Sequence, residues 1–250
     1  AAGPAALTAR PGDPVPSVTP APLPGPVLMR QTLRMVTFLH WPIAPATVAH
    51  LFPAGCQPDV LGEHTYLGLV GLRATAASLG RSGRLGGFGE VNVRLYSRDE
   101  QGRQGVVFLS LDVDRSDVAL AGRLFTGLPY RWSHLGDMGQ GDGVIGFRCR
   151  RRWPADAVVS EWLVEPGGPV VNPSPLDIFL TARWGLHLSR LGRTWWLPMS
   201  HEPWPLHRAQ LRVWHDELAA AAGVPVPVDT PPSVLCSPGV HARLGRPVRL

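Results

Sequence analysis

Polar and apolar residues alternate along residues 90–95, EVNVRL. Successive side chains of an extended strand point to opposite faces, so Glu90, Asn92 and Arg94 share one face of a strand predicted over residues 89–98. The other face carries three aliphatic side chains, those of Val91, Val93 and Leu95. The pattern therefore predicts a β-strand with one polar and one apolar face.

Residues 106–114, VVFLSLDVD, repeat this alternation after a turn centred on Gln101-Gly102. The two segments are predicted to pair as an antiparallel hairpin, with Phe108 and Ser110 on the mixed polar face of the second strand. An open sheet with water on one side produces such a pattern, and so does a barrel or cone with a polar pocket inside. Alternation alone leaves both arrangements open.

The rest of the chain contains further strand and helix patterns. Strands are predicted at 29–41, 64–74, 141–153 and 158–167, with a hairpin within 186–202 and a strand or short helix at 210–218. Helices are predicted at 43–55, 115–127 and 172–185. The helix at 115–127 is expected to carry an apolar stripe formed by Val118, Ala121, Leu124 and Phe125. These elements predict a mixed α+β domain dominated by antiparallel strands.

Two segments fall outside the strand and helix patterns. Residues 78–89, SLGRSGRLGGFG, are rich in glycine but lack the Lys-Ser/Thr of a phosphate-binding loop, so a flexible rim or turn is expected there. Residues 1–28 consist mainly of alanine and proline and are expected to form a flexible arm that crosses the surface. We therefore predict an arm over 1–28 and a single domain over 29–250.

Composition narrows the class of protein. Hydrophobic residues make up 44% and charged residues 17%, as in a globular protein. No stretch approaches the ~18 uninterrupted apolar residues of a membrane span, and no secretory signal is visible, so we expect a cytoplasmic protein without a membrane partner. The net charge of +5 comes with no recognisable nucleic-acid motif, so no nucleic-acid partner is expected. All 24 basic residues are arginine, and a chain without lysine cannot form a side-chain Schiff base with a carbonyl compound.

Two arrangements of reactive side chains are considered and set aside. The histidines and glutamate of segment 201–207, HEPWPLH, cannot share a helix face as in a zinc-binding HExxH motif, because the segment contains two prolines. A triad of Ser110, His134 and Asp112 lacks the G-x-S-x-G elbow that positions a hydrolase nucleophile. We expect neither a metal site nor a bound cofactor.

Four passages carry a resemblance to a known family: MRQTLRMVTFLHWPI at 29–43, FGEVNVRLY at 88–96, AGRLFTGLPYR at 121–131 and SPGVHARLGRP at 237–247. The chain resembles the acetoacetate decarboxylase-like superfamily, and more closely its uncharacterised YqjF-type branch. The resemblance implies a twisted antiparallel sheet closed into a cone or barrel around a small-molecule cavity, with a few flanking helices.

The resemblance also implies site residues. The decarboxylases carry Gly-Phe-Pro-Lys-Lys, whose first lysine forms the Schiff base, and the matching run here is GLPYR at 127–131. Tyr130 stands at the position of that lysine, Arg131 at that of its neighbour, and Glu90 at that of an active-site glutamate. An active-site arginine near the N-terminus matches Arg30 or Arg34. With tyrosine in place of lysine, the imine mechanism of the decarboxylases is excluded.

The function implied is an enzyme that acts on a small carbonyl or β-keto compound by acid–base chemistry, of lyase, dehydratase, isomerase or cyclase type, in a setting such as secondary metabolism. Glu90, Tyr130 and Arg131 are the expected catalytic residues. The expected substrate-binding residues are Arg30, Arg34, Asn92, Arg94, Phe108 and Ser110. One alternative is a ligand-binding or sensor protein that kept the cavity without catalysis. A second alternative is a structural or interaction protein with a vestigial pocket, which a cavity filled by side chains would favour. A homo-oligomer is compatible with each of these hypotheses.

Overall fold

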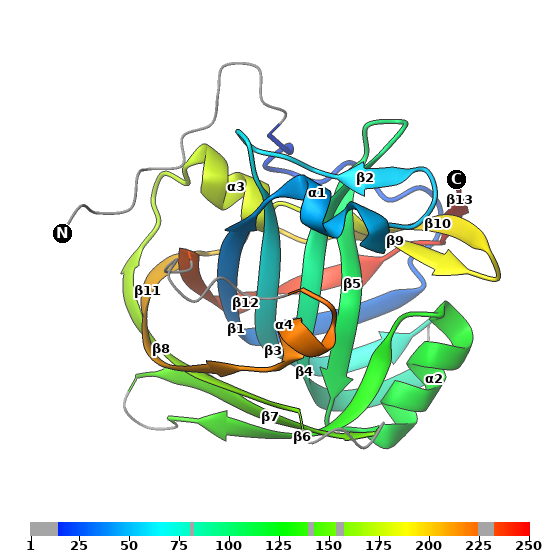
Figure 1. The fold of residues 1–250 in the computed structure, drawn as a ribbon. Helices are drawn as coiled ribbons and strands as arrows, with labels where there is room; N and C mark the ends of the chain where they lie inside the picture. Colours follow the sequence, from blue (N-terminus) through cyan, green and yellow to red (C-terminus); the bar gives the residue numbers. More distant parts are fainter. Residues whose placement is uncertain (1–14, 81–82, 140–142, 154–157, 225–232) are drawn as a thin grey trace.

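The computed structural model describes residues 15–80, 83–139, 143–153, 158–224 and 233–250 (Figure 1). Its strands are β1 (Met29–Ile43), β2 (Cys56–Pro58), β3 (Thr65–Leu79), β4 (Gly83–Asp99), β5 (Gln104–Val113), β6 (Tyr130–Met138), β7 (Ile145–Trp153), β8 (Val159–Pro169), β9 (Gly185–Arg190), β10 (Arg193–Ser200), β11 (His207–Asp216), β12 (Ser233–Leu244) and β13 (Val248–Arg249). Its helices are α1 (Pro45–Val48), a 3-10 turn at Ala49–Leu51, α2 (Ser116–Thr126), α3 (Pro175–Thr181) and α4 (Leu218–Ala221). The strands form one mainly antiparallel sheet, which confirms the predicted α+β class.

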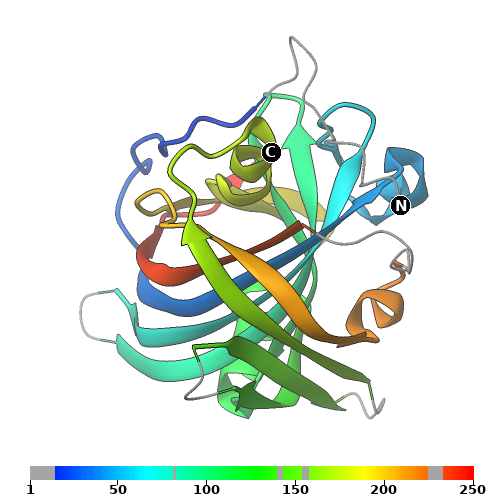
Figure 2. The same cartoon turned by 90° about the vertical axis from the view of Figure 1, so that its left-hand side faces the viewer.

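The sheet closes on itself twice. β10, β9, β5, β4, β3, β1 and β12 pair in that order, and β12 pairs back with β10; we call this closed path the cavity ring. β5, β6, β7, β8, β11, β12, β1, β3 and β4 form a second closed path, the core ring. β12, β1, β3, β4 and β5 belong to both rings, and we call them the shared wall. In Figure 2, β8 and β11 cross in front of β1 obliquely. They form the side of the core ring opposite the shared wall.

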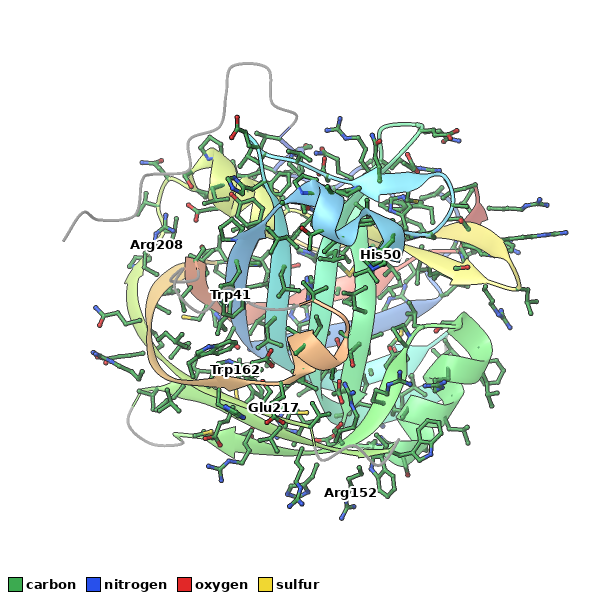
Figure 3. The ribbon with its side chains drawn as sticks, in the orientation of Figure 1. Trp41, His50, Arg152, Trp162, Arg208 and Glu217 are labelled. Carbon is green, nitrogen blue, oxygen red and sulfur yellow. The ribbon has the colours of Figure 1, made fainter. Side chains whose placement is uncertain are left out.

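The shared wall is covered on both of its faces. Val93 and Trp41, for example, point into the core ring and pack there in a cluster that includes Trp162 of β8. Figure 3 shows Trp41 and Trp162 inside the molecule, whereas Arg152 and Arg208 point outward. The alternate residues of the same strands face the cavity ring. The polar face predicted for residues 90–94 therefore points to an interior space and not to bulk water.

A β-bulge at Leu109 separates two residues that simple alternation places together. Val93 pairs with Ser110 and Arg94 pairs with Phe108, so Leu109 is the extra residue. Phe108 consequently lies on the cavity side with Arg94, whereas Ser110 lies on the core side with Val93. The prediction that Phe108 and Ser110 share a face is wrong, because alternation assumes an unbroken register.

Several element boundaries also differ from the sequence pattern. The glycine-rich segment 78–89 is largely strand, because β3 and β4 pair through it as a long hairpin. β6 was not predicted at all, and residues 210–218 lie mostly in a strand, β11. α3 begins with a Ser174 cap, in which Ser174 and Asp177 form reciprocal hydrogen bonds. It ends early because the Arg183 Nε donates to the Phe179 carbonyl at 2.7 Å, which satisfies a carbonyl at the helix end.

α2 confirms the helix predicted at 115–127 and part of its apolar stripe, since Val118 packs against a buried cluster. Leu124 and Phe125 are exposed, and the ring of Tyr130 lies against Gly122 instead. A Cβ at Gly122 would come within 2.5 Å of that ring, so the close approach of α2 to Tyr130 depends on glycine. The helix therefore packs through Val118, Ala119 and Gly122, and the C-terminal part of the predicted stripe stays exposed.

The described part of the N-terminal arm, residues 15–28, carries no helix or strand. The Trp184 Nε1 donates to the Ser17 carbonyl at 2.7 Å, and the Leu28 amide donates to the Leu244 carbonyl at 2.8 Å. This segment runs along the outside of the sheet (Figure 2). Residues 1–14 of the predicted arm lie outside the described residues. Among the residues that the structure describes, no helix is long and apolar enough to cross a membrane.

A buried ionic cluster joins β5, β6 and β7 inside the core ring. The Arg151 guanidinium donates to both carboxylate oxygens of Asp112, at 2.9 and 3.0 Å, and to the Ser110 hydroxyl at 2.9 Å. The Ser133 hydroxyl also donates to Asp112, at 2.7 Å. Removing one partner of a buried ion pair leaves the other charge without compensation. Loss of any one member is therefore expected to destabilise the region where β5 of the shared wall meets β6 and β7.

We expect Arg151→Met to lower the free energy of unfolding by about 3–5 kcal/mol, since Asp112 would stay buried without its cation. The matched control is Arg148→Met on the same strand, because Arg148 is exposed and its pair with Glu161 at 2.7 Å is worth only about 0–1 kcal/mol. Denaturant unfolding at neutral pH measures both. Equal losses in the two variants would contradict a structural role for the cluster.

Candidate functional site

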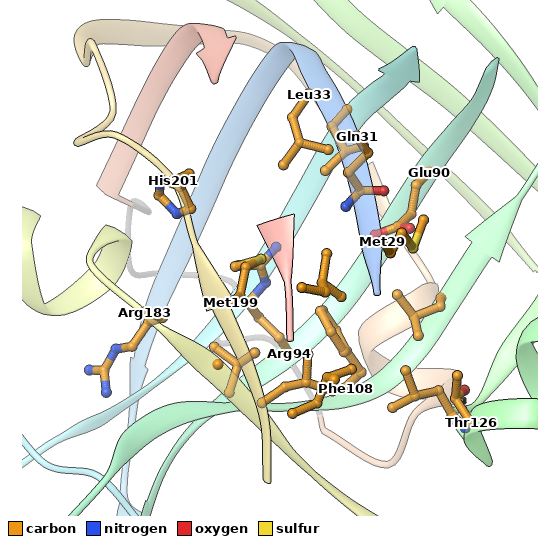
Figure 4. Close-up of a pocket in the computed structure, with 18 of the residues that line it drawn as sticks. Met29, Gln31, Leu33, Glu90, Arg94, Phe108, Thr126, Arg183, Met199 and His201 are labelled. Carbon is orange, nitrogen blue, oxygen red and sulfur yellow. Dashed lines mark hydrogen bonds between the residues drawn. The ribbon is translucent and has the colours of Figure 1, made fainter. Parts of the chain in front are cut away.

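A cavity of about 320 Å³ lies inside the cavity ring (Figure 4). All seven strands of that ring contribute to its lining, together with the end of α2, the segment before Tyr130 and residues near His201. Most of the lining is aliphatic or aromatic. The polar lining residues are Gln31, Glu90, Arg94, Thr126, Tyr130, Thr181, Arg183 and His201. An apolar cavity with a few polar groups is typical of a small-molecule site, and its open volume disfavours a purely structural role.

Glu90, Asn92 and Arg94 form a hydrogen-bonded row along β4. The Asn92 side-chain amide donates to the Glu90 Oε1 at 2.9 Å, and the Arg94 Nε donates to the Asn92 Oδ1 at 2.8 Å. Asn92 is fully buried and does not line the cavity, whereas Glu90 and Arg94 do. The amide thus fixes both charged side chains in place while it keeps them from pairing directly.

Burial dominates the electrostatics of this row. It raises the pKa of Glu90 above its usual value, although the Asn92 hydrogen bond and the Arg94 charge act in the opposite direction. Burial also lowers the pKa of Arg94. The Nη atoms of Arg94 have no hydrogen-bond partner within the part of the chain that the structure describes. Arg94 thus presents donors to the cavity, beside a carboxyl group that is poised to exchange a proton.

Tyr130 lies at the start of β6 and faces the same cavity. Its ring is held by Gly122, and its carbonyl accepts from the Arg123 Nη1 at 3.0 Å. Burial, and secondarily the charge of Glu90, raise the pKa of the Tyr130 hydroxyl. The hydroxyl consequently stays protonated around neutral pH and is available as a hydrogen-bond donor.

The structure brings four of the predicted site residues to the cavity and places the others elsewhere. Glu90, Arg94, Phe108 and Tyr130 line it, and the Arg94 guanidinium lies 5.4 Å from the centre of the Phe108 ring. Asn92 contributes through its two hydrogen bonds. Four predicted site residues are outside the lining, namely Arg30, Arg34, Ser110 and Arg131.

Register explains these four positions. Arg30 and Arg34 are exposed, because on β1 the residues Gln31 and Leu33 face the cavity. Ser110 belongs to the buried Asp112 cluster on the other side of the bulge. Arg131 follows Tyr130 in an extended strand and therefore points away from the cavity that Tyr130 faces. Gln31 lies two residues before Leu33 and therefore shares its face of the strand, so alternation from Leu33 could have placed Gln31 on the cavity side.

His201 is a lining residue that the sequence reasoning did not assign to the cavity. Its Nδ1 donates to the Glu202 carbonyl at 2.6 Å, which leaves Nε2 with the lone pair of a neutral ring. Burial lowers the pKa of His201, and its Nε2 has no partner among the described residues. Trp184 and Trp204 flank the imidazole, each with ring centres 4.8 Å away. Figure 4 shows His201 and Glu90 on opposite sides of the cavity, with Arg94 between them.

Among the described residues, no group of three or more histidine, cysteine, aspartate or glutamate side chains is placed to hold a metal ion. The histidines and glutamate of segment 201–207 illustrate this. His201 and Glu202 use a ring nitrogen and a carboxylate oxygen on backbone groups, and His207 is engaged by the Gly167 carbonyl.

This closed sheet with an interior cavity is the fold of the acetoacetate decarboxylase-like proteins. An acetoacetate decarboxylase from Legionella pneumophila subsp. pneumophila str. Philadelphia 1 superposes with a TM-score of 0.62 over 92% of both chains, at 11% identity. The enduracididine biosynthesis enzyme MppR, solved with the condensation product of pyruvate and imidazole 4-carboxaldehyde, gives 0.61 over 96% of this chain and 98% of MppR, at 15% identity. An acetoacetate decarboxylase-like enzyme from Sphingomonas wittichii RW1 gives 0.58 over 92% and 95%, at 14% identity.

The chain belongs to the DUF2071 family, described as an uncharacterized conserved protein, whose profile matches residues 30–241. The uncharacterized protein YqjF of Bacillus subtilis (strain 168) is 27% identical over 210 residues, which cover 82% of this chain and 85% of YqjF. The resemblance to the YqjF-type branch of the superfamily is thereby confirmed.

The raised pKa of Glu90 leads to a stability prediction. The native state binds the Glu90 proton more tightly than the unfolded state, so this contribution to stability is present at acid pH and lost as the pH rises through the folded pKa. Glu90→Gln imitates the protonated group. We expect the variant to match the parent protein in acid and to be more stable at higher pH, by about 1.4 kcal/mol for each unit of raised pKa.

Thermal unfolding of both proteins at pH 5 and pH 8.5 measures this difference. The control is Glu165→Gln, since Glu165 is half exposed and pairs with Arg212 at the surface. Its effect should be small at both pH values. A Glu90→Gln protein that is less stable than the parent at pH 8.5 would show that ionised Glu90 is stabilised by its surroundings.

Proposed function

We propose that this protein is an enzyme that moves a proton on a small carbonyl compound carrying a carboxylate, without an imine intermediate. The observation that carries the proposal is the arrangement in one apolar cavity of a desolvated carboxyl group, Glu90, and a guanidinium with unpartnered donors, Arg94. Tyr130 adds a protonated hydroxyl on the same lining.

Arg94 binds the carboxylate of the substrate in this proposal. Its Nε is held by Asn92, and its Nη atoms face the cavity, so the guanidinium is oriented before the substrate arrives. A carboxylate that meets a fixed guanidinium in an apolar space forms charge-assisted hydrogen bonds, which are stronger than those between neutral groups. The bound carboxylate also places a negative charge next to the buried Arg94 guanidinium.

Glu90 and Tyr130 carry out the chemistry in this proposal. Ionised Glu90 takes a proton from the carbon next to the carbonyl, and the electron pair of the C–H bond moves into the carbonyl group to give an enolate. The Tyr130 hydroxyl donates a hydrogen bond to the enolate oxygen. If Glu90 returns the proton to a different carbon of the enolate system, the step is an isomerisation. If Glu90 instead protonates a β-hydroxyl group, its C–O bond breaks, water leaves, and the enolate electrons form a C=C bond, which is a dehydration. If the enolate carbon attacks a second carbonyl of the same substrate and Glu90 protonates the resulting alkoxide, the step is a cyclisation. The raised pKa of Glu90 suits both proton transfers near neutral pH.

Two further observations support this class of reaction. The chain contains no lysine, so the imine chemistry of a lysine-bearing decarboxylase is closed to it. Among the proteins with this fold, MppR binds a condensation product of pyruvate, a compound that carries a carboxylate beside a carbonyl. MppR is also a biosynthesis enzyme, and a role in secondary metabolism is part of the proposal.

The second candidate function is ligand binding without turnover, as in a sensor. It is favoured by the tyrosine at position 130, where a related decarboxylase carries its reactive lysine. Such a protein would bind a keto acid saturably and release it unchanged. Equilibrium dialysis followed by mass spectrometry of the recovered ligand separates the two functions.

We expect the protein to deplete at least one member of a panel of 2-oxo and 3-oxo carboxylates, measured by mass spectrometry. With that substrate, Glu90→Gln and Tyr130→Phe should each lower kcat by about 10²–10⁴-fold, the usual contribution of general acid–base groups. Arg94→Met should mainly raise KM for substrates that carry a carboxylate. If Glu90→Gln and Tyr130→Phe both turn over the substrate at the parental rate, the proposed chemistry fails.

The matched control for Tyr130→Phe is Tyr66→Phe, because Tyr66 is buried outside the cavity lining. The control for Glu90→Gln is again Glu165→Gln at the surface. Both controls should retain the parental kcat. The pH profile of kcat/KM should rise with pH through the raised pKa of Glu90, and Glu90→Gln should abolish that limb.

A further inference from the structure

Three large apolar side chains that line the cavity are also exposed on the outside of the protein. They are Leu28, Leu79 and Phe125, with exposed fractions of 37%, 56% and 73%. Leu28 and Leu79 come from segments that meet, because the Gly80 amide donates to the Leu28 carbonyl at 2.7 Å. Phe125 comes from the last turn of α2. These three residues border the opening of the cavity, and we call them the apolar rim.

Most of the cavity lining is apolar. It includes Leu33, Val36, Val70, Leu72, Leu111 and Met199. A ligand held by Arg94 therefore contacts mainly hydrocarbon, together with polar groups such as Gln31 and Thr126. A small keto acid such as pyruvate would leave most of that surface in contact with water or empty, and neither arrangement gains the free energy of apolar burial.

We propose that the substrate is an amphipathic carboxylic acid, whose carboxylate binds Arg94 and whose unbranched apolar chain leaves the cavity across the apolar rim. This deepens the proposed function and rests on its assignment of Arg94 as the anion site. A cavity of about 320 Å³ lies near the lower end of the usual range for ligand pockets. A chain longer than the cavity must continue past Leu79 and Phe125, which explains why these residues are apolar although exposed.

Saturated carboxylates test this substrate class without any chemistry, because they carry no carbonyl group to react. The probes are butanoate, hexanoate, octanoate and decanoate, with binding measured by isothermal titration calorimetry. We expect affinity to rise by up to about fourfold for each added methylene, the value of full apolar burial. Octan-1-ol should bind far more weakly than octanoate, and Arg94→Met should remove this preference for the acid.

The apolar rim is tested by Phe125→Ser, with Leu124→Ser as the matched control. Both residues are exposed on α2, but Leu124 does not line the cavity. We expect Phe125→Ser to weaken decanoate by up to about tenfold and to leave butanoate unchanged, whereas Leu124→Ser should change neither. Because both side chains are exposed, these variants report on binding even if Arg94→Met fails to fold.

Three results would overturn the inference. One is an affinity that does not depend on chain length, and another is an equal effect of Phe125→Ser and Leu124→Ser on decanoate. The third is a parent protein that sediments as an oligomer, while both variants sediment as monomers and keep the parental dependence of affinity on chain length. The exposed apolar side chains would then contact a second copy of this chain. If the carboxylate series binds as expected but no keto acid is turned over, the proposed enzyme function fails while the ligand class stands.

Discussion

The structure depends on five strands that are buried on both faces. β12, β1, β3, β4 and β5 belong to two closed rings, so most side chains along them face either the cavity or a packed core, whereas Arg30 and Arg34 on β1 are exposed. A sheet with both faces covered must place any polar group where a partner exists, because an unpaired buried polar group is costly. The shared wall meets this constraint on its core side with the Asp112–Arg151 cluster and on its cavity side with the Asn92 amide.

Charged side chains are arranged differently on the core side and on the cavity side of the shared wall, and this difference defines the site. On the core side, Arg151 and Asp112 are in direct contact and the hydroxyls of Ser110 and Ser133 complete their hydrogen bonds. On the cavity side, Asn92 stands between Glu90 and Arg94 and holds each through one bond. The first arrangement neutralises charge within the protein. The second leaves an acid and a cation each with unfilled capacity for a ligand.

Much of the architecture follows from the sequence pattern. Alternation predicted the central hairpin and the segregation of Glu90, Asn92 and Arg94 from Val91 and Val93, because successive side chains of an extended strand point to opposite faces. The position of Tyr130 followed from the resemblance of residues 121–131, and the family membership is confirmed.

The misplaced residues have local causes. A single bulge residue, Leu109, moved Ser110 to the other ring, and no periodicity marks where a bulge falls. Arg30 and Arg34 were taken from the resemblance, which left the register of β1 open, and that register turns Gln31 and Leu33 inward. His201 lay in a proline-rich segment without any period, so only its tertiary neighbours reveal its position.

The core ring and the cavity ring separate dense packing from open volume, two requirements that compete in most small domains. The cluster that includes Trp41, Trp162 and Phe147 fills the core ring, and the open volume lies in the cavity ring. Residues that face the cavity can change size or polarity with little effect on the packed core ring, because side chains on opposite faces of a strand do not contact each other. A family built on this plan can acquire new ligands by exchanging alternate residues of the same five strands while the intervening residues stay as they are.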